Sequence, residues 1–580
     1  MTTKQKFLLA GIVALAVFFR FYALTSMPGG LFPDEAANGL DINLMQEGQL
    51  QPFYERGNGR EALFFYMLWG SVELFGKGHW QHHLVSAMVG VLSVIVCYAV
   101  ARRLFSMDVF LRGSSSLDNH QKFGEVDPLV HRATNIALLS AFLMAVSTWH
   151  VVLSRTAFRA NLIPLFAGLT FYLLLKTFQN ENPAKQKINA FLTGAVFALG
   201  FYSYIAYRIL VPIIGILVVW PWLSTGFVNG IKRWWKLALI FIAAFIIFFA
   251  PLFNYFYTHP GTFVGRSGQV SIFNPDLHKG DLIGTLGQVT WLSLKAYFID
   301  GDLNWRHNIS GFPFLSQLVS PFFGAGLVII TFLAAWYIFA PRKRPGFWKY
   351  AALAGWFWGM LLPVVTTAEG IPHGLRSIGT IPPVFIISAL ALYKLGEWFW
   401  LAHKKFNETR PVYKTESLMV DPQSYYRNII LRFFMKLAVV CFIFALTLQA
   451  YFAYFVYASS SAENFYAFRS DLTSVSAYLK KRCTKGSTYL ILDKFSVQTT
   501  DYLTSDWHGN FEHKCSVPYR QVDPENSWEL SGLKPGDEVI FAQSSIFDIK
   551  KFKTYHPEAR LKMEVRNKFG QAIMAVYRIQ

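Results

Sequence analysis

Long stretches without Asp, Glu, Lys or Arg constrain this chain more than any other feature of its sequence. Most of them approach the ~20 residues that an α-helix needs to cross the hydrocarbon core of a bilayer. An earlier stretch, Phe7 to Thr25, is interrupted only by Arg20 and lacks a small-residue cleavage pattern after it, so we interpret it as a retained helix. We therefore expect about eleven membrane-spanning helices. The charge-free runs are residues 84–101, 133–154, 160–175, 188–207, 209–231, 237–258, 307–341, 350–368, 377–393 and 437–462.

The distribution of charge gives these helices an orientation. The chain has a net charge of +19, which suits either a nucleic-acid binder or a membrane protein with basic inner loops. With the N-terminus in the cytoplasm, the inner segments hold 25 basic and 9 acidic residues, whereas the outer loops hold 11 and 12. This is the positive-inside pattern. It predicts a multi-pass protein of the plasma (inner) membrane with an extracytoplasmic C-terminus, the lipid bilayer as a partner and no nucleic-acid partner.

Composition divides the chain into two expected domains. Residues 1–457 carry the apolar runs and are predicted to form a polytopic α-helical membrane domain. In residues 458–580 charge returns, and short strand-like runs appear at Thr488–Leu492 and Glu538–Ala542. We therefore expect a small extracytoplasmic α/β domain at the C-terminus.

Three smaller features complete the organisation. Residues 105–131 are rich in Ser, Asp and Asn and predict a flexible cytosolic loop, and residues 396–430 predict a polar, basic cytosolic linker. Cys483 and Cys515 fall in the C-terminal domain. In an oxidising compartment they would form a disulfide, but two buried thiols fit the sequence equally well.

Two charged motifs stand out in the outer segments. Asp34 and Glu35 follow the first helix. An acidic pair at a membrane surface is costly to dehydrate, which indicates a functional role. The structural alternative is a helix start, because carboxylates favour the first turn of a helix. Arg155 and Arg159 are four residues apart, which predicts one face of a helix and a pair of guanidinium groups for a phosphate. Contact with lipid headgroups is the alternative for both arginines.

Three more outer segments combine aromatic, amide, imidazole and charged side chains, a mixture that suits a hydroxylated ligand. Aromatic belts, turns and headgroup contacts are the structural alternatives. The side chains of Asp300, Asp302 and His307 are types that bind metals, but their spacing is not diagnostic of a metal site. The sequence therefore assigns no metal ligands and no definite cofactor, and a divalent cation is the one cofactor that it leaves as an alternative. The candidate residues are Tyr204, Tyr207, Arg208, Asp302, Asn304, His307, Asn308, Glu369, His373 and Arg376.

Taken in order, these motifs resemble the GT-C superfamily of polytopic glycosyltransferases. The likeness is to family 39, the dolichyl-phosphate-mannose protein mannosyltransferase and aminoarabinose transferase group. Asp34-Glu35 looks like the family's acidic pair, and the segment Gly59 to Tyr66 looks like its first-loop motif, with Arg60-Glu61 where prolines are common. Arg376, before a Pro-bearing helix, resembles its late carrier-binding arginine. Asn161 stands where many relatives carry an acid.

The resemblance implies a membrane enzyme of GT-C fold. Because the sequence has no nucleotide-binding loop, we expect a polyprenyl-phosphate sugar as donor and a protein, lipid or glycan as acceptor at the outer face, with inversion at the anomeric carbon. Asp34 is the expected general base, and Glu35 is expected to orient an arginine or the acceptor. Arg155, Arg159 and Arg376 are expected at the donor phosphate, and Arg60 and Glu61 near the substrate. The alternatives are a transporter or flippase for a lipid-linked sugar, a scaffolding protein, and a metal-dependent oligosaccharyltransferase-like enzyme.

Overall fold

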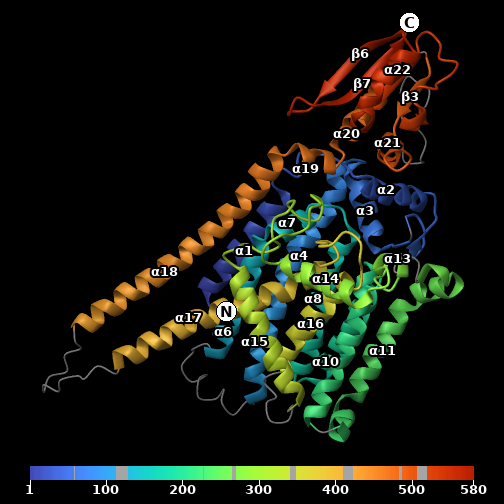
Figure 1. The fold of residues 1–580 in the computed structure, drawn as a ribbon. Coiled ribbons are helices and arrows are strands. Elements are labelled where there is room, and N and C mark those ends of the chain that lie inside the picture. Colours follow the sequence, from blue (N-terminus) through green and yellow to red (C-terminus); the bar gives the residue numbers. More distant parts are fainter. Residues whose placement is uncertain are drawn as a thin grey trace, which may run out of the picture.

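The structure is a computed structural model that describes residues 1–57, 59–112, 128–225, 227–263, 270–339, 348–408, 422–482, 486–505 and 519–580. Most of the chain forms a bundle of helices, and a small sheet domain that contains the C-terminus lies at one end of the bundle (Figure 1). The predicted fold class is therefore confirmed, and this is a multi-pass membrane protein. The exact domain boundary between residues 457 and 458 stays a prediction.

Each of the eleven predicted apolar runs coincides with a helix of the bundle. Six described helices are long and apolar enough to cross a membrane, or seven if α6 and α7 (Thr148–Ser154), bent by 63°, count as one broken span. The number of spans therefore stays a prediction. The helices are α1 (Thr3–Phe21), α4 (His79–Arg112), α6 (Pro128–Ala145), α8 (Leu162–Gln179), α9 (Pro183–Gly200), α10 (Leu210–Thr225), α11 (Phe227–Thr258), α15 (Ser320–Phe339), α16 (Trp348–Val365), α17 (Ile381–Glu408) and α18 (Pro422–Tyr451).

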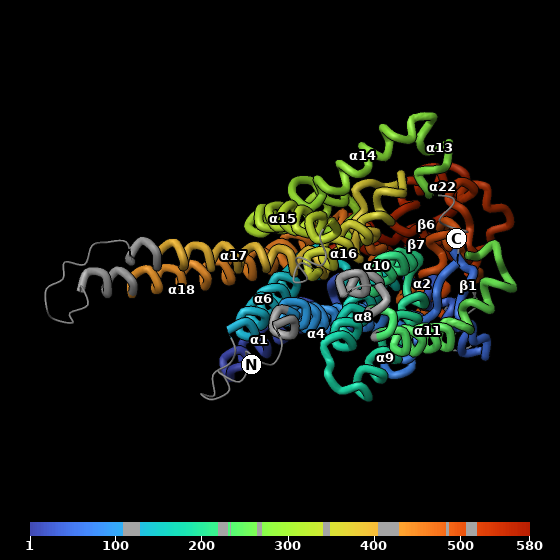
Figure 2. The backbone as a smooth tube through the Cα atoms, turned by 90° about the horizontal axis from the view of Figure 1, so that it is seen from below, coloured from blue at the N-terminus to red at the C-terminus, as the bar shows by residue number. Residues whose placement is uncertain are grey.

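The predicted linker 396–430 differs from the structure. Helix α17 continues to Glu408, and α18 begins at Pro422, so described helix occupies most of the range. The helix-forming Leu, Lys and Glu residues there outweigh the polar composition on which the prediction rested. Both helices project away from the bundle (Figure 2). The predicted loop 105–131 lies largely outside the described residues, as do Cys483 and Cys515.

Two shorter helices lie between the bundle and the sheet domain. Helix α2 (Pro33–Gln46) begins with proline at its first position and carries Asp34 and Glu35 in its first turn, where proline and carboxylates are both favoured. Helix α3 (Leu63–Phe75) follows the two-stranded ribbon of β1 (Phe53–Tyr54) and β2 (Arg60–Glu61). Helix α3 packs against α2 and α4.

The C-terminal domain contains a five-stranded mixed sheet in the order β4-β3-β5-β7-β6. Strand β3 is parallel to β4 and β5, whereas β7 is antiparallel to β5 and β6. Helix α20 (Ser470–Lys481) packs on one face and α22 (Ile549–Tyr555) on the other, so the central strand is buried on both sides. The predicted strands are confirmed. The strands are β3 (Thr488–Ile491), β4 (Arg520–Val522), β5 (Glu538–Ala542), β6 (Ala559–Arg566) and β7 (Ala572–Ile579).

The sheet domain contacts the membrane domain through α21 (Val497–Thr504) and α2. Tyr502 is fully buried and packs so closely on Gly39 that a Cβ atom there would lie 2.5 Å from the phenol ring. The Thr499 hydroxyl donates to the carbonyl of Leu31 at 3.1 Å, and the rings of Phe32 and Phe495 lie 5.7 Å apart. The C-terminal domain therefore rests directly on the helix that carries Asp34 and Glu35.

Candidate active site

Loops from distant parts of the sequence meet at a polar cavity of about 200 Å³. We refer to it as the acid–arginine cavity. A larger cavity of about 360 Å³ between α8, α9, α10 and α11 is lined by apolar side chains and two threonines, so the polar cavity is the better candidate for chemistry. The polar residues that line the acid–arginine cavity are Asp34, Asn38, Arg60, Arg159, Tyr204, Arg306, His307, His373 and Arg376.

Asp34 is the carboxylate of this cavity. Its side chain is 48% exposed, and Oδ1 and Oδ2 lie 3.8 Å from Arg60 and 3.9 Å from Arg306. Arg60 is held in place because it also donates to the carbonyl of Asp34 and, at 2.7 Å, to the side chain of Asn38. Burial lowers the pKa of Arg60 to about 10, and the pKa of Arg306 is likewise lowered by burial. Both guanidinium groups place positive charge beside the Asp34 carboxylate.

Glu35 has a different environment although it is the next residue. It is fully buried, and its carboxylate accepts hydrogen bonds from the backbone N–H groups of Ala157 at 2.6 Å and Phe32 at 3.0 Å. His83 lies 3.4 Å away. Burial alone would raise the Glu35 pKa, but His83 and the two N–H groups outweigh it and hold the pKa below its ordinary value. The carboxylate contacts the protein core and not the cavity, and the expectation that Glu35 orients an arginine or the acceptor stays a prediction.

Only one of the two paired arginines reaches the cavity. Helix α7 ends at Ser154, so Arg155 and Arg159 do not share a helix face. Arg155 is fully buried and donates to the carbonyls of Phe19 and Met27 and to the Tyr454 hydroxyl. The structure thus corrects its expected contact with a phosphate: Arg155 satisfies backbone carbonyls at a helix junction.

Arg159 instead lines the acid–arginine cavity. It lies 3.5 Å from Glu61, and its guanidinium stacks over the Tyr204 ring at 5.4 Å. Glu61 is buried and also lies 3.5 Å from Arg208, so one carboxylate orients two arginines. Tyr207 does not join them, because it is buried in the bundle with its hydroxyl 3.1 Å from Thr170. Tyr207 is therefore a core residue and not a stacking platform.

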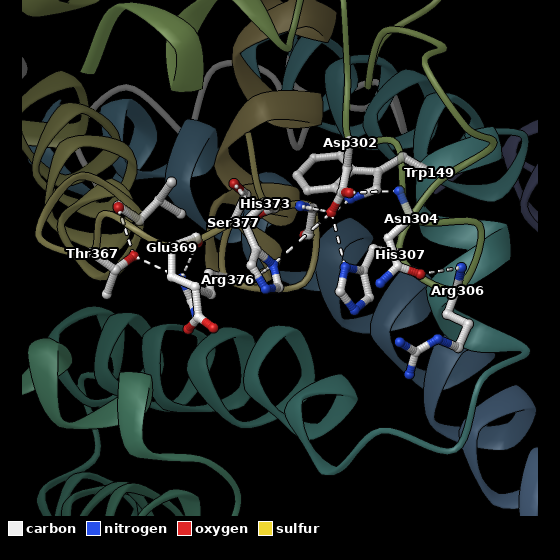
Figure 3. Close-up of polar contacts among 12 residues, drawn as sticks. Trp149, Asp302, Asn304, Arg306, His307, Thr367, Glu369, His373, Arg376 and Ser377 are labelled. Atoms are coloured by element: carbon white, nitrogen blue, oxygen red, sulfur yellow. Dashed lines mark hydrogen bonds and ion pairs between the residues drawn. The ribbon is translucent and has the colours of Figure 1, made fainter. Parts of the chain in front are cut away.

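The opposite wall consists of two loops, residues 300–312 and 366–377 (Figure 3). Arg376 donates to the carbonyl of Glu369 at 2.7 Å and to the Thr367 hydroxyl at 3.1 Å, and it lies 3.4 Å from the Glu369 carboxylate. His307 lies 2.9 Å from Asp302, which His373 approaches to 4.0 Å. These contacts hold Arg376 and two imidazoles at the cavity.

Two amides brace the same wall without entering it. The Asn304 side chain accepts from the backbone N–H of Arg306 at 3.1 Å, and the Asn308 side chain donates to the carbonyl of Phe312 at 2.5 Å. Asn304 and Asn308 therefore shape the loop that presents Arg306 and His307.

Comparison with known proteins extends this picture. A family model described as dolichyl-phosphate-mannose-protein mannosyltransferase matches residues 62–117. The crystal structure of ArnT from Cupriavidus metallidurans bound to undecaprenyl phosphate superimposes with a TM-score of 0.56 at 13% identity, covering 98% of this chain and 97% of that one. The chain has a GT-C fold.

Other solved structures are similar to this chain to differing extents. ArnT in the apo state matches with a TM-score of 0.53 and 14% identity over 98% of this chain and 97% of that chain. An oligosaccharyltransferase of Archaeoglobus fulgidus, tethered to an acceptor peptide, has a TM-score of 0.47 and 11% identity over 99% of this chain and 74% of that one. No curated protein sequence matches the chain.

Within the GT-C fold, the cavity contains two residues that the sequence analysis did not select. Asn38 lies four positions after Asp34 in α2, and that helical spacing places both on one face. Arg306 lies between Asn304 and His307 in a segment already marked as polar. Its guanidinium carbon lies 3.4 Å from the centre of the Phe32 ring, which sets it beside Asp34. The sequence offered one signal for Arg306: it directly precedes His307, which was already a candidate residue.

Proposed function

We propose that this protein transfers a sugar from a polyprenyl-phosphate-linked donor to an acceptor at the outer face of the membrane. The charge of the acid–arginine cavity carries the proposal: among the described residues, four guanidinium groups and one carboxylate line it, and Glu61 and Glu369 pair with two of the arginines from outside the lining. Such an excess of fixed positive charge in a confined site favours an anionic ligand, and arginine matches phosphate geometry. The GT-C fold shared with a protein whose structure contains undecaprenyl phosphate supports a lipid phosphate as that anion.

The four arginines divide between the two ends of the reaction. Arg60 and Arg306 form ion pairs with Asp34, whereas Arg159 and Arg376 pair with Glu61 and Glu369. The carboxylate partner of Arg376, Glu369, has a side chain that is 63% exposed, so a phosphate can replace it without uncovering a buried charge. Arg376 is therefore the first choice for the donor phosphate, with Arg159 as the second. Fixed guanidinium groups there stabilise the negative charge that grows on the leaving phosphate.

Asp34 acts as the general base in this mechanism. The acceptor O–H gives its proton to the Asp34 carboxylate while the oxygen forms a bond to the anomeric carbon. The bond from that carbon to the phosphate oxygen breaks, and its electron pair leaves with polyprenyl phosphate. One displacement of this kind inverts the anomeric centre. The half-exposed position of Asp34 leaves room for an acceptor, and a positioned base contributes about 10²–10⁴-fold.

The proposal is tested with the purified full-length protein in proteoliposomes supplied with a panel of polyprenyl-phosphate sugars and candidate acceptors. We expect one donor to yield free polyprenyl phosphate together with a glycosylated acceptor. Asp34→Asn should lower this turnover about 10²–10⁴-fold and Asp34→Glu should retain part of it. Asp276→Asn, which changes an exposed acid in the first turn of α13 (Pro275–His278), is the matched control.

Two outcomes would contradict the proposal. Full turnover in a folded Asp34→Asn variant would remove the general base. Movement of the intact lipid-linked sugar across the bilayer, with no release of polyprenyl phosphate from any donor, would identify a transporter instead.

A further inference from the structure

We infer that Asp302, His307 and His373 form a binding site for a divalent transition metal, with zinc as the best match. The three side chains offer one ligand atom each, and these atoms all lie within 4.8 Å of one another. Two come from loop 300–312 and the third from loop 366–377, so the site joins segments that are about seventy residues apart in the sequence. The inference goes beyond the proposed function and does not depend on it.

The distances between these atoms suit a tetrahedral ion. Zinc binds imidazole nitrogen at about 2.0–2.1 Å and carboxylate oxygen at about 2.0–2.2 Å, which places neighbouring ligand atoms roughly 3.3–3.5 Å apart. Asp302 Oδ2 lies 2.9 Å from Nδ1 of His307 and 4.0 Å from Nδ1 of His373, on either side of that value. The two rings are stacked with centroids 4.6 Å apart and planes at 20°. Binding of one ion by both imidazoles requires the rings to turn out of this stack, because the lone pair of each nitrogen lies in the plane of its ring.

The surroundings hold the carboxylate ready for such an ion. Asp302 Oδ1 accepts from the backbone N–H of Asn304 at 2.8 Å, and Oδ2 accepts from that of Gly374 at 2.7 Å. The carbonyl of Gly374 in turn accepts from the Trp149 indole at 3.2 Å. Hydrogen bonds of this kind to a ligating carboxylate are typical of metal sites, where they fix the orientation of the ligand.

The choice of metal follows from the ligand atoms. Two imidazole nitrogens and one carboxylate oxygen suit zinc and its neighbours in the first transition row, whereas magnesium and calcium prefer oxygen alone. His307 and Asp302 are both buried. His373 is also held in place by the backbone N–H of Arg376, which donates to its Nδ1 at 3.4 Å.

The metal would serve to fix the wall of the acid–arginine cavity. Loop 300–312 carries Arg306, which lies beside Asp34, and loop 366–377 carries Arg376. An ion that joins the two loops sets the spacing between these arginines. The metal would thus position Arg306 and Arg376. Both imidazoles, His307 and His373, line the same cavity.

The test measures metal directly in the full-length protein, without donor or acceptor. After treatment with chelator and removal of the chelator, the protein is titrated with Zn²⁺ and with Co²⁺, and bound metal is determined by mass spectrometry. We expect one ion per chain and a visible Co²⁺ absorption typical of a tetrahedral site. Asp302→Asn, His307→Ala and His373→Ala should each weaken binding at least about tenfold. Asp300→Asn is the matched control, because Asp300 lies two residues away, is 64% exposed and pairs with Lys295.

Further variants keep the test decisive if an alanine variant does not fold. His307→Cys and His373→Cys retain a ligand and should add a thiolate-to-cobalt absorption band. Two results overturn the inference: no stoichiometric binding of Zn²⁺, Co²⁺ or Ni²⁺, or binding that none of these substitutions changes. Asp302 and His307 would then serve only to form their hydrogen bond. Since glycosyl transfer is measured separately, its failure leaves the metal result untouched.

Discussion

The neighbouring acids Asp34 and Glu35 should affect activity and stability in opposite ways when they are substituted. Asp34 is half exposed and makes only long ion pairs of 3.8 and 3.9 Å with arginines. Exposed ion pairs contribute about 0–1 kcal/mol, so Asp34→Asn should leave stability nearly unchanged. In the proposed mechanism it should still lower turnover about 10²–10⁴-fold, because it removes the base.

Glu35 should show the reverse. Its carboxylate is the acceptor for the buried N–H groups of Ala157 and Phe32. Each buried donor left without an acceptor costs about 1–3 kcal/mol, so Glu35→Ala should cost about 2–6 kcal/mol. With an unfolding entropy of roughly 2 cal/mol/K per residue over the 580 residues, this corresponds to a melting temperature lower by about 2–5 °C.

The assay combines two measurements on the same preparations. Thermal unfolding of the detergent-solubilised protein is followed by intrinsic Trp fluorescence and by size exclusion after heating, and turnover is followed by release of polyprenyl phosphate. The wild type, Asp34→Asn, Glu35→Gln and Glu35→Ala are compared, with Asp276→Asn as control. Turnover is measured well below every melting temperature so that loss of folded protein does not count as loss of chemistry.

The pH dependence of stability provides a second test of the contacts of Glu35 with the backbone N–H groups of Ala157 and Phe32. The pKa of Glu35 is lowered in the folded state, so its stabilising contribution is present above the unfolded pKa of about 4.3 and is lost as pH falls through the folded value. The difference in melting temperature between wild type and Glu35→Gln should therefore be constant near neutral pH and should shrink in acid. A Glu35→Gln variant that melts like the wild type yet is inactive would refute the reasoning, as would an Asp34→Asn variant that is equally destabilised.

Three further predictions concern other parts of the site. Arg376→Ala should raise the apparent KM for the donor about 10- to 150-fold, since charge-assisted hydrogen bonds contribute about 1.5–3 kcal/mol, and an unchanged KM would exclude Arg376 from the donor site. Arg155→Met should lower the melting temperature by leaving the carbonyls that it caps unpaired, and if it instead raised KM with no effect on stability, a phosphate role would be restored. Gly39→Val should displace Tyr502 and loosen the sheet domain from α2, detected as faster proteolysis between the domains together with lower turnover, whereas wild-type behaviour would show that this contact does not position Asp34.

Local patterns in the sequence were sufficient to predict the architecture. The apolar runs predicted the positions of the bundle helices because a segment that lies in lipid must satisfy its backbone internally, whatever its neighbours are. The helix start at Asp34 and Glu35, given as the alternative to a functional role, is found in α2, because the preference of carboxylates for a first helical turn acts over three or four residues. The strands β3 and β5 were likewise predicted from short runs of β-branched and apolar residues.

The tertiary structure decided which of the charged residues face the cavity. Successive residues on a helix point about 100° apart, so the acidic pair had to divide between cavity and core, but only the packing of α2 against Ala157 shows that Glu35 is the buried one. The break after Ser154 separates Arg155 from Arg159 in a way that their spacing did not reveal. Asp302 and His373 meet because two loops fold together. Contacts between distant segments depend on the three-dimensional path of the chain, and a single sequence records them only as separate polar residues.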